Sequence, residues 1–305
     1  MIAVDLFAGG GGMACAMRSR GIEARHVEVD ADACDTLTAA GFDDVVRCDV
    51  RDPSWYPAGG VSLLHGSPPC PKWSRANRTE AQQAKAVDGW PWMLDAVRAL
   101  RPRVVTVENV RGAPAEVWAR DLEALGYCAR AWLLDAADYG AAQTRTRWFV
   151  VASLDGVPTR PTPTHGAPLL GLRPPRTLRE CLDPQGERAV YAPGTGRAAA
   201  EPWRLDAPSP TVVCADVHGT RAGAFNGWTF HGGPDRMSDA LFLALGWRRA
   251  TVAECARAQG FPEGHPFRGK SEAKYRQAGN AVEVNVGRAV LASALACLSG
   301  RSVAA

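Results

Sequence analysis

Short apolar runs alternate with amphipathic stretches over the first 150 residues of the chain. The runs that predict strands lie at residues 2–7, 24–29, 45–48, 61–65, 103–108, 129–135 and 148–152. Patterns suited to helices lie between several of them, at residues 14–20, 31–40, 91–100 and 114–125. This alternation is typical of βαβ units. The sequence therefore predicts an α/β fold, with a Rossmann-like, mostly parallel sheet, helices on both faces, and ligands at the carboxyl ends of the strands.

The pattern changes after residue 152. Prolines and glycines are frequent between residues 158 and 175, and clean periodicity is lacking up to about residue 234. Helical patterns return at residues 238–245, 251–258 and 282–298. We therefore predict a first domain over residues 1–152, a smaller loop-rich domain over residues 153–247, and a segment, residues 248–305, that returns to the first domain.

Composition excludes several classes of protein. The hydrophobic share of 46% and the charged share of 22% are near globular values, which argues against a disordered or collagen-like chain. The N-terminus lacks the pattern of a signal peptide, and no apolar run has the length expected to span a bilayer, so we expect a cytoplasmic protein without a membrane partner. The nine cysteines occur without a Cys-x-x-Cys pair, which favours neither a metal site nor a disulfide framework.

A glycine-rich turn follows the first predicted strand and leads into a helix. Such a turn lets a ligand approach the backbone at a helix N-terminus, although alone it fits a tight connection equally well. The next strand ends at Glu28 and Val29, and the third at Asp49 and Val50. An acid about 20 residues past a glycine turn is suited to ribose hydroxyls, and Asp49 is suited to an adenine amino group. Three successive strand ends thus fit an adenosyl ligand.

A proline-stiffened loop follows the fourth predicted strand. Pro68 and Pro69 precede Cys70, and two prolines restrict the backbone enough to pre-organise the loop. A cysteine that merely packs in a turn is the alternative. Among the nine cysteines, only Cys70 has neighbours that favour a nucleophile held at the carboxyl edge of the sheet.

Two later motifs add charged groups. Glu108 and Asn109 follow an apolar run, so they end another predicted strand. Arg145 and Arg147 lie two residues apart just before the next strand, and in an extended backbone both point to one side. Guanidinium groups there can hold a carbonyl oxygen, a phosphate or a carboxylate. A charged guard on a solvated strand edge is the alternative for an isolated pair.

Taken in order, the motifs DLFAGGGG, EVD, CDV, SPPC, ENV, QTRTR and AGNAVEVNV resemble those of the cytosine C5-specific DNA methyltransferase family. The resemblance covers residues 1–152 and 248–296. It implies a DNA (cytosine-5-)-methyltransferase that moves a methyl group from S-adenosylmethionine to carbon 5 of cytosine and releases S-adenosylhomocysteine. Residues 1–152 would form the S-adenosylmethionine-binding catalytic domain, and residues 153–247 the target-recognition domain.

The resemblance also implies roles for individual residues. Cys70 would attack carbon 6 of the cytosine, and Glu108 would bond N3 and the exocyclic amine. Arg147, with Arg145, would address O2, and Asn109 would hold the catalytic loop. The residues implied to bind S-adenosylmethionine are Asp5, Leu6, Phe7, Ala8, Gly9, Gly10, Gly11, Gly12, Glu28, Val29, Asp49, Val50, Pro68, Asn280 and Ala281.

The chemistry explains why these groups are needed. Carbon 5 of cytosine becomes nucleophilic only when a covalent bond at carbon 6 makes it enamine-like, and a thiolate can form that bond. A free thiol has a pKa of about 8.5, so nearby positive charge, to which Lys72 would contribute, must favour the thiolate. A base stacked in double-stranded DNA cannot reach a buried thiol, so we expect the cytosine to be flipped out.

The predicted DNA contacts come from the loop after Cys70 and from the middle of the chain. The loop side chains suited to phosphates and to covering a flipped base are Lys72, Trp73, Ser74, Arg75 and Arg78. The family commonly has glutamine, a small residue and phenylalanine where this chain has Pro71, Lys72 and Trp73. In the middle, the side chains that can donate to base edges are His218, Arg221, Asn226 and Arg236; an ordinary surface role is the alternative for each.

Three other functions share part of this motif set. A tRNA cytosine C5 methyltransferase has the same fold, but this chain lacks the Cys-Phe-Thr element of that branch. A non-catalytic DNA-binding relative would not need Cys70, Glu108 and Arg147 together, and an enzyme for free nucleotides would not need the cationic loop. We therefore expect double-stranded DNA as the partner of a monomer, with a cognate restriction endonuclease as a further candidate partner.

Overall fold

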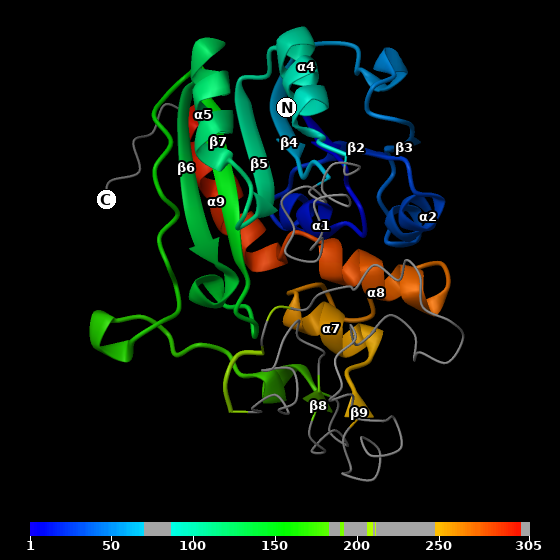
Figure 1. Cartoon of the computed structure of the whole chain (residues 1–305), viewed down its shortest axis with the longest axis vertical. Coiled ribbons are helices and arrows are strands. Elements are labelled where there is room, and N and C mark those ends of the chain that lie inside the picture. Colours follow the sequence, from blue (N-terminus) through cyan, green and yellow to red (C-terminus); the bar gives the residue numbers. More distant parts are fainter. Residues whose placement is uncertain (70–86, 183–189, 192–205, 210, 212–247, 300–305) are drawn as a thin grey trace, which may run out of the picture.

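A seven-stranded sheet forms the centre of the computed structural model, which describes residues 1–69, 87–182, 190–191, 206–209, 211 and 248–299 (Figure 1). In the described residues the strand order is β3-β2-β1-β4-β5-β7-β6. The strands are β1 (Ile2–Leu6), β2 (Ala24–Glu28), β3 (Val45–Arg47), β4 (Val61–Gly66), β5 (Val104–Val110), β6 (Cys128–Asp135) and β7 (Thr146–Ser153). All seven were predicted from apolar runs, and the predicted fold class is confirmed.

Strand β7 runs in the opposite direction to its two neighbours in the sheet, β5 and β6. Strands β1 to β5 pair in parallel, whereas β7 lies between β5 and β6 and is antiparallel to both. A short connection through the 3-10 turn η2 (Ala136–Tyr139) joins β6 to β7, and such a connection permits only antiparallel pairing. The start of β7 therefore lies beside the end of β5, where Val110 pairs with Arg147.

Helices cover both faces of the sheet (Figure 1). One apolar core, on the face of α1 (Gly12–Arg18) and α9 (Val284–Leu298), includes Leu63 and Phe149. The other, on the face of α4 (Trp90–Leu100) and α5 (Ala115–Ala124), includes Leu64 and Val150. Alternate strand residues thus enter opposite cores, as the pleat of a sheet requires.

The end of the chain adds three helices at the carboxyl edge and over one face: α7 (Val252–Ala258), α8 (Ser271–Asn280) and α9. Helix α7 was predicted, and α9 begins two residues later than predicted. Helix α8 was not predicted, because its residues are mostly polar. The helix predicted at residues 238–245 lies outside the described residues. Among the described residues of the first half of the chain, a further helix is α2 (Ala31–Ala39), and a 3-10 turn η1 (Pro53–Trp55) follows β3.

Within the described part of the chain, the stretch Ser271–Leu298 reaches the length and hydropathy of a membrane-spanning helix. This differs from the expectation that no run would do so. The backbone is extended at Ala281, with ψ at 147°, so α8 and α9 are separate helices. Helix α9 packs against α1, β5 and β7, and most of the apolar stretch is buried. Its apolar composition is therefore that of a core helix.

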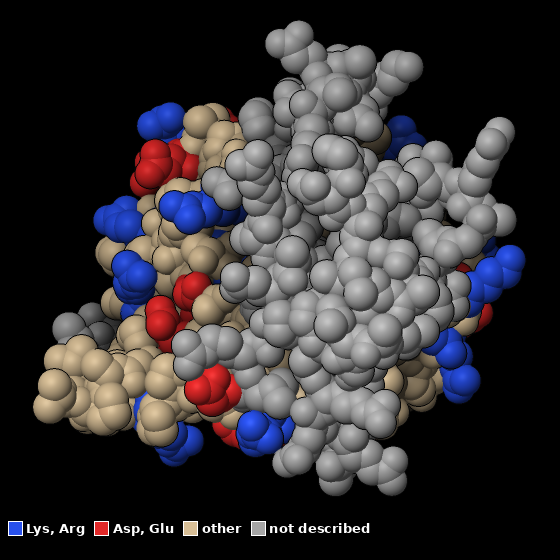
Figure 2. All heavy atoms as spheres, turned by 60° about the horizontal axis from the view of Figure 1, so that its bottom comes forward, with Lys and Arg blue, Asp and Glu red and all other residues tan. Residues whose placement is uncertain are grey.

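Shorter elements lie below the sheet in Figure 1. They are the 3-10 turns η3 (Pro168–Leu170) and η4 (Leu178–Cys181), and the paired strands β8 (Val190–Tyr191) and β9 (Arg248–Arg249). Figure 2 turns this side towards the viewer; the described basic and acidic side chains are interspersed along its margin rather than gathered by sign.

Candidate active site

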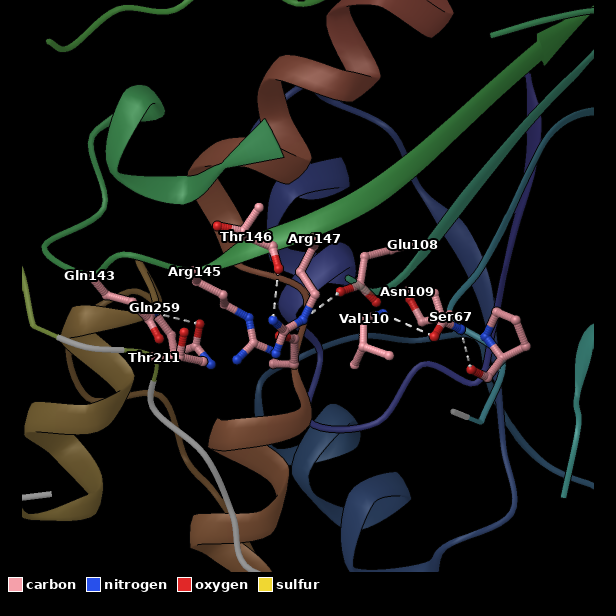
Figure 3. A network of polar contacts seen from close by, with 12 residues as sticks. Ser67, Glu108, Asn109, Val110, Gln143, Arg145, Thr146, Arg147, Thr211 and Gln259 are labelled. Atoms are coloured by element: carbon pink, nitrogen blue, oxygen red, sulfur yellow. Dashed lines mark hydrogen bonds and ion pairs between the residues drawn. The ribbon is translucent and has the colours of Figure 1, made fainter. Parts of the chain in front are cut away.

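A buried carboxyl group and two guanidinium groups meet where β5 ends and β7 begins. Glu108 is 6% exposed, and its Oε1 lies 3.4 Å from Nε of Arg147. Arg145 lies two residues before Arg147 in the sequence, and Figure 3 shows both guanidinium groups on the same side of the chain. The spacing of two residues predicted this shared side. The antiparallel register, which the spacing does not contain, brings Arg147 to Glu108.

Burial controls the protonation of Glu108. Loss of solvent raises the pKa of its carboxyl above the ordinary value, while Arg147 and then Arg145 oppose the rise. A raised pKa favours the neutral acid, which offers one O–H donor together with acceptor oxygen. This carboxyl can therefore donate to a ring nitrogen and accept from an amino group at the same time.

Arg145 also links the site to the C-terminal helices. It is 3% exposed, and its Nη2 donates to the carbonyl of Ala281, 3.0 Å away, between α8 and α9. Its backbone N–H donates to Oδ1 of Asp135 at 3.0 Å. Both ends of this residue are thus fixed, which leaves Arg147 as the more accessible of the two cations, with 15% of its side chain exposed.

The loop before Cys70 is anchored by buried polar groups. Asn109 Nδ2 donates to the carbonyl of Pro68 at 2.9 Å, and the N–H of Ser67 donates to the carbonyl of Leu6 at 3.3 Å. These bonds attach the loop to β5 and β1. Cys70 itself lies outside the described residues, but the chain that leads to it is fixed within two residues of the thiol.

Beneath that loop lies His65, which sequence analysis missed. Its ring is fully buried, with Nδ1 2.8 Å from Oγ1 of Thr106 and Nε2 3.0 Å from Oγ of Ser67. Burial lowers the pKa of His65 to about 4, so the ring is neutral and one nitrogen donates while the other accepts. The sequence marks His65 only as a polar residue at the end of an apolar run.

The glycine turn is braced by the acid at the end of β2. Glu28 Oε2 accepts from the N–H of Gly9 at 2.8 Å, and its Oε1 accepts from Val29 and Asp30, each at 2.8 Å. Gly9 has a φ of 53°, and a side chain there would meet only the carbonyl of Phe7, 3.9 Å away. The described residues thus leave space above Gly9 beside a fixed carboxylate.

Two other glycines of the turn, Gly10 and Gly12, face the C-terminal segment. A Cβ at Gly10 would lie 3.0 Å from Cβ of Gln277, and one at Gly12 would lie 2.1 Å from the carbonyl oxygen of Val282. His265 reinforces this contact, because its Nε2 is 2.9 Å from the carbonyl of Gly10. Close packing against α8 and against the segment between α8 and α9 is therefore a reason for glycine that the sequence did not reveal.

A family model for C-5 cytosine-specific DNA methylase matches residues 1–169 and 242–296. The chain belongs to this family. The matched segments contain the glycine turn, the end of β5, the start of β7 and the junction of α8 with α9. The predicted family and the predicted activity class, DNA (cytosine-5-)-methyltransferase, are confirmed.

Similar proteins extend this family match over nearly the whole chain. Type II methyltransferase M.NaeI of Lentzea aerocolonigenes is 31% identical over 94% of this chain and 73% of its own length. Type II methyltransferase M.NgoMIV of Neisseria gonorrhoeae is 30% identical over 94% and 95%. The crystal structure of S. pombe Dnmt2 methyltransferase has a TM-score of 0.68 at 19% identity, covering 97% and 98%, and supports the fold.

Several residues predicted from the methylase motifs have side chains directed away from the open edge. Asp5 is 1% exposed, with Oδ2 3.1 Å from Nδ1 of buried His26. Leu6 and Ala8 are buried in the two cores. Any ligand contact of these three residues would therefore involve the backbone.

Other predicted residues lie near the strand ends without a direct contact between them. Asp49 pairs with Arg51, Nη2 to Oδ2 at 2.5 Å, which lowers the pKa of the carboxyl to about 2. Val29 is 63% exposed and Val50 half-buried, while Asn280, at the end of α8, is exposed. The predicted residues outside the described part of the chain are Cys70, Lys72, Trp73, Ser74, Arg75, Arg78, His218, Arg221, Asn226 and Arg236.

Proposed function

We propose that this methyltransferase modifies cytosine in double-stranded DNA through a covalent bond between Cys70 and carbon 6 of a flipped-out base. The observation that carries the proposal is the buried Glu108 carboxyl with Arg147 at 3.4 Å, beside the loop that Asn109 attaches to β5 through Pro68. A pyrimidine ring placed there would have an acid on one edge, a guanidinium on another, and the thiol-bearing loop close by.

Glu108 would activate the ring. Its raised pKa supports a neutral acid that donates to N3 of cytosine while its other oxygen accepts from the exocyclic amine. Arg147 would donate to O2. Together these bonds draw electron density from the ring, which makes carbon 6 electrophilic towards a thiolate.

The covalent steps balance without an oxidant or reductant. The Cys70 thiolate forms a bond to carbon 6, and the ring electrons shift so that carbon 5 becomes enamine-like. Carbon 5 then accepts a methyl group, its proton leaves to a base, and the electron pair of that C–H bond expels the thiolate. Flipping the base costs a few kcal/mol, which the predicted cationic loop after Cys70 would offset.

S-adenosylmethionine is the methyl donor that the family implies, and it would supply an electrophilic methyl group on a sulfonium sulfur. The strand ends fit an adenosyl group: Gly9 is open above its α-carbon, the Glu28 carboxylate is fixed beside it, and Asp49 is ionised. Phe7, at a φ of 58°, lies in the same turn. We propose that Glu28 holds the ribose and Asp49 the adenine amine, with the backbone of residues 5–12 around them.

A fluorinated substrate tests the mechanism. Fluorine at carbon 5 of cytosine replaces the proton that must leave after methyl transfer, so the thiolate cannot be expelled and the enzyme should remain covalently bound. We expect an SDS-stable adduct when the full chain is incubated with S-adenosylmethionine and duplex DNA that contains 5-fluorocytosine in random sequence. Cys70→Ala should abolish the adduct, whereas Cys128→Ala, at a half-buried thiol on β6, should retain it.

Two outcomes would contradict the proposal: a folded wild-type chain that binds DNA without forming the adduct, or Cys70→Ala forming it as well. Labelled methyl transfer to duplex DNA and to tRNA, measured in parallel, distinguishes the RNA alternative. The names of the relatives support a further proposal, that a restriction endonuclease recognises the same DNA sequence. Bisulfite sequencing of DNA from expressing cells would identify that sequence.

A further inference from the structure

The turn between β1 and α1 contains four consecutive glycines, at residues 9–12. Glycine has the greatest backbone freedom, so a turn of this composition needs partners outside itself to keep one shape. Glu28 holds the N–H of Gly9 at 2.8 Å. The carbonyl of the next residue, Gly10, lies 2.9 Å from Nε2 of His265, which is the one hydrogen-bond partner of this carbonyl among the described residues.

The protonation of His265 follows from its two polar neighbours. A carbonyl can only accept, so Nε2 carries the ring hydrogen and Nδ1 keeps a lone pair. Sγ of Cys15, on the first turns of α1, is 3.9 Å from Nδ1. Burial raises the pKa of the Cys15 thiol to about 12, so its S–H is available as a weak donor. Burial also lowers the pKa of His265, against the bond to Gly10, which favours the neutral ring. One imidazole thus joins the turn to α1.

The direction of the His265 ring is set by aromatic packing. The ring centroid lies 4.5 Å from that of Phe261 and 4.6 Å from that of Phe267, and the two phenylalanine rings are 5.2 Å apart. Both phenylalanines are buried. Aromatic rings at these distances attract one another, so the imidazole is held in place before it donates. The bond to Gly10 therefore requires little further loss of side-chain freedom.

His265 lies on the packed side of the turn. A Cβ at Gly10 would be 3.0 Å from Cε1 of Phe267, and one at Gly11 would be 3.8 Å from Cε1 of His265. A Cβ at Gly9 would meet only a backbone carbonyl, 3.9 Å away. The space above Gly9 is the part proposed for the cofactor, so the imidazole supports the turn from behind and leaves that space open.

We propose that His265 is a positioning residue for S-adenosylmethionine, whose Nε2–H bond to the Gly10 carbonyl holds the glycine turn in the shape that receives the cofactor. This role rests on the proposed function, because it requires the cofactor to bind at the turn. His265 touches neither cofactor nor DNA. Its contribution is therefore to cofactor affinity rather than to the chemical step, and it acts on the same turn as Glu28.

A matched pair of substitutions separates the hydrogen bond from the packing. His265→Phe keeps a ring between Phe261 and Phe267 and removes the donor, whereas His265→Gln keeps an N–H donor near the position of Nε2. Loss of this bond should raise the dissociation constant of S-adenosylmethionine, measured by calorimetry on the full chain, about 5- to 10-fold in His265→Phe. His265→Gln should stay within about twofold of the wild-type value. The control His165→Phe makes the same exchange at a half-buried histidine that packs against Gly140, and cofactor affinity should not change.

Kinetics distinguish positioning from a general loss of structure. At saturating S-adenosylmethionine, the single-turnover rate on duplex DNA should stay within about twofold of wild type in both His265 variants. Glu28→Ala combined with His265→Phe should weaken cofactor binding by less than the product of the separate losses, because both side chains hold one turn. Asp49→Asn combined with His265→Phe should give the simple product, because Asp49 is outside the turn.

Three results would overturn the role of His265: wild-type cofactor affinity in His265→Phe, equally weak binding in His265→Gln, or a large loss of rate at saturating cofactor in His265→Phe. In each case, cofactor binding by the wild-type chain would leave the proposed function intact. A folded wild-type chain that does not bind S-adenosylmethionine would instead overturn the proposed function.

Discussion

Two carboxyl groups at the same edge of the sheet are in opposite electrostatic situations. Glu108, near the end of β5, is buried and its pKa is raised. Asp49, just beyond β3, is solvent-accessible, and hydrogen bonds from Arg51 lower its pKa to about 2. Both have an arginine partner, so the difference arises from burial rather than from the presence of a cation. Fold position alone thus does not determine whether an acid at a strand end acts as a proton donor or as an anion.

This contrast suits one edge to the two ligands of the proposed function. On the β1–β2–β3 side, Asp49 is ionised and would accept from the amino group of an adenosyl ligand. On the β4–β5–β7 side, burial raises the pKa of the Glu108 carboxyl and so favours the neutral acid, which would offer a ring both a donor and an acceptor. Substitutions that change one of these carboxyl groups and leave the other intact test this difference in protonation most sharply.

Removing the proton of Glu108 should have the largest effect. Glu108→Gln keeps size and hydrogen-bonding capacity but offers an amide donor that does not share an acidic proton with the ring. Since general acid groups typically contribute 10²- to 10⁴-fold, we expect single-turnover methyl transfer to fall about 10³-fold. S-adenosylmethionine affinity, measured by calorimetry, should stay within about twofold of the wild-type value, because Glu108 is on β5 and the proposed cofactor site is at the ends of β1, β2 and β3. A variant with more than about a tenth of the wild-type rate would contradict the assignment.

Glu283 extends the comparison to a buried carboxyl without a predicted role. Burial raises its pKa to about 7, against hydrogen bonds from Val286 and Asn285. A raised folded-state pKa stabilises the protein fully below about pH 4.5, and that stabilisation is lost as pH rises through about 7. Relative to Glu283→Gln, the wild-type free energy of unfolding should fall by about 3 kcal/mol between pH 4.5 and pH 8. Urea denaturation of both proteins at the two pH values measures this, and parallel curves would refute it.

Glu28 should matter for cofactor binding rather than for chemistry. Glu28→Ala removes the acceptor of three backbone N–H groups, at Gly9, Val29 and Asp30, and so loosens the turn as well as the ribose contact. We expect S-adenosylmethionine to bind about 30-fold more weakly, with the single-turnover rate at saturation changed by less than about threefold. A large loss of rate at saturating cofactor would contradict a role for Glu28 in cofactor binding rather than in chemistry.

Asp49→Asn should produce the smallest effect. The exchange keeps an acceptor oxygen and removes the charge, so cofactor affinity should fall about fivefold. Because the pKa of Asp49 is about 2, its wild-type contribution should stay constant from pH 5 to pH 9, while the methyl-transfer rate falls on the alkaline side as Glu108 loses its proton. Measured over the same pH series, the affinity for S-adenosylmethionine should therefore stay constant while the methyl-transfer rate falls. A cofactor affinity that falls together with the rate would contradict the separate roles of Asp49 and Glu108.

The sequence predicted the strands well and the contacts between them only in part. Apolar runs locate the strands most clearly at the centre of the sheet, where β1, β4 and β5 are buried on both faces, and the strand ends of a parallel sheet share an edge. The meeting of Glu108 with Arg147 depends on the antiparallel insertion of β7 between β5 and β6, which no local pattern contains. The packing of Gly12 against Val282 and the Gln143–Gln259 bond join residues more than 100 positions apart, so they too required the fold.

If Cys70 attacks a cytosine that Glu108 and Arg147 activate, the covalent bond to the base must lie at the Cys70 sulfur. The trapped complex with 5-fluorocytosine DNA should be digested with protease and nuclease and examined by mass spectrometry. We expect a single modified peptide, which contains Cys70 and carries a methylated, fluorinated cytosine nucleotide, and we expect Glu108→Gln to reduce its rate of formation. A nucleotide attached to another cysteine, or methylated DNA produced by Cys70→Ala, would contradict it.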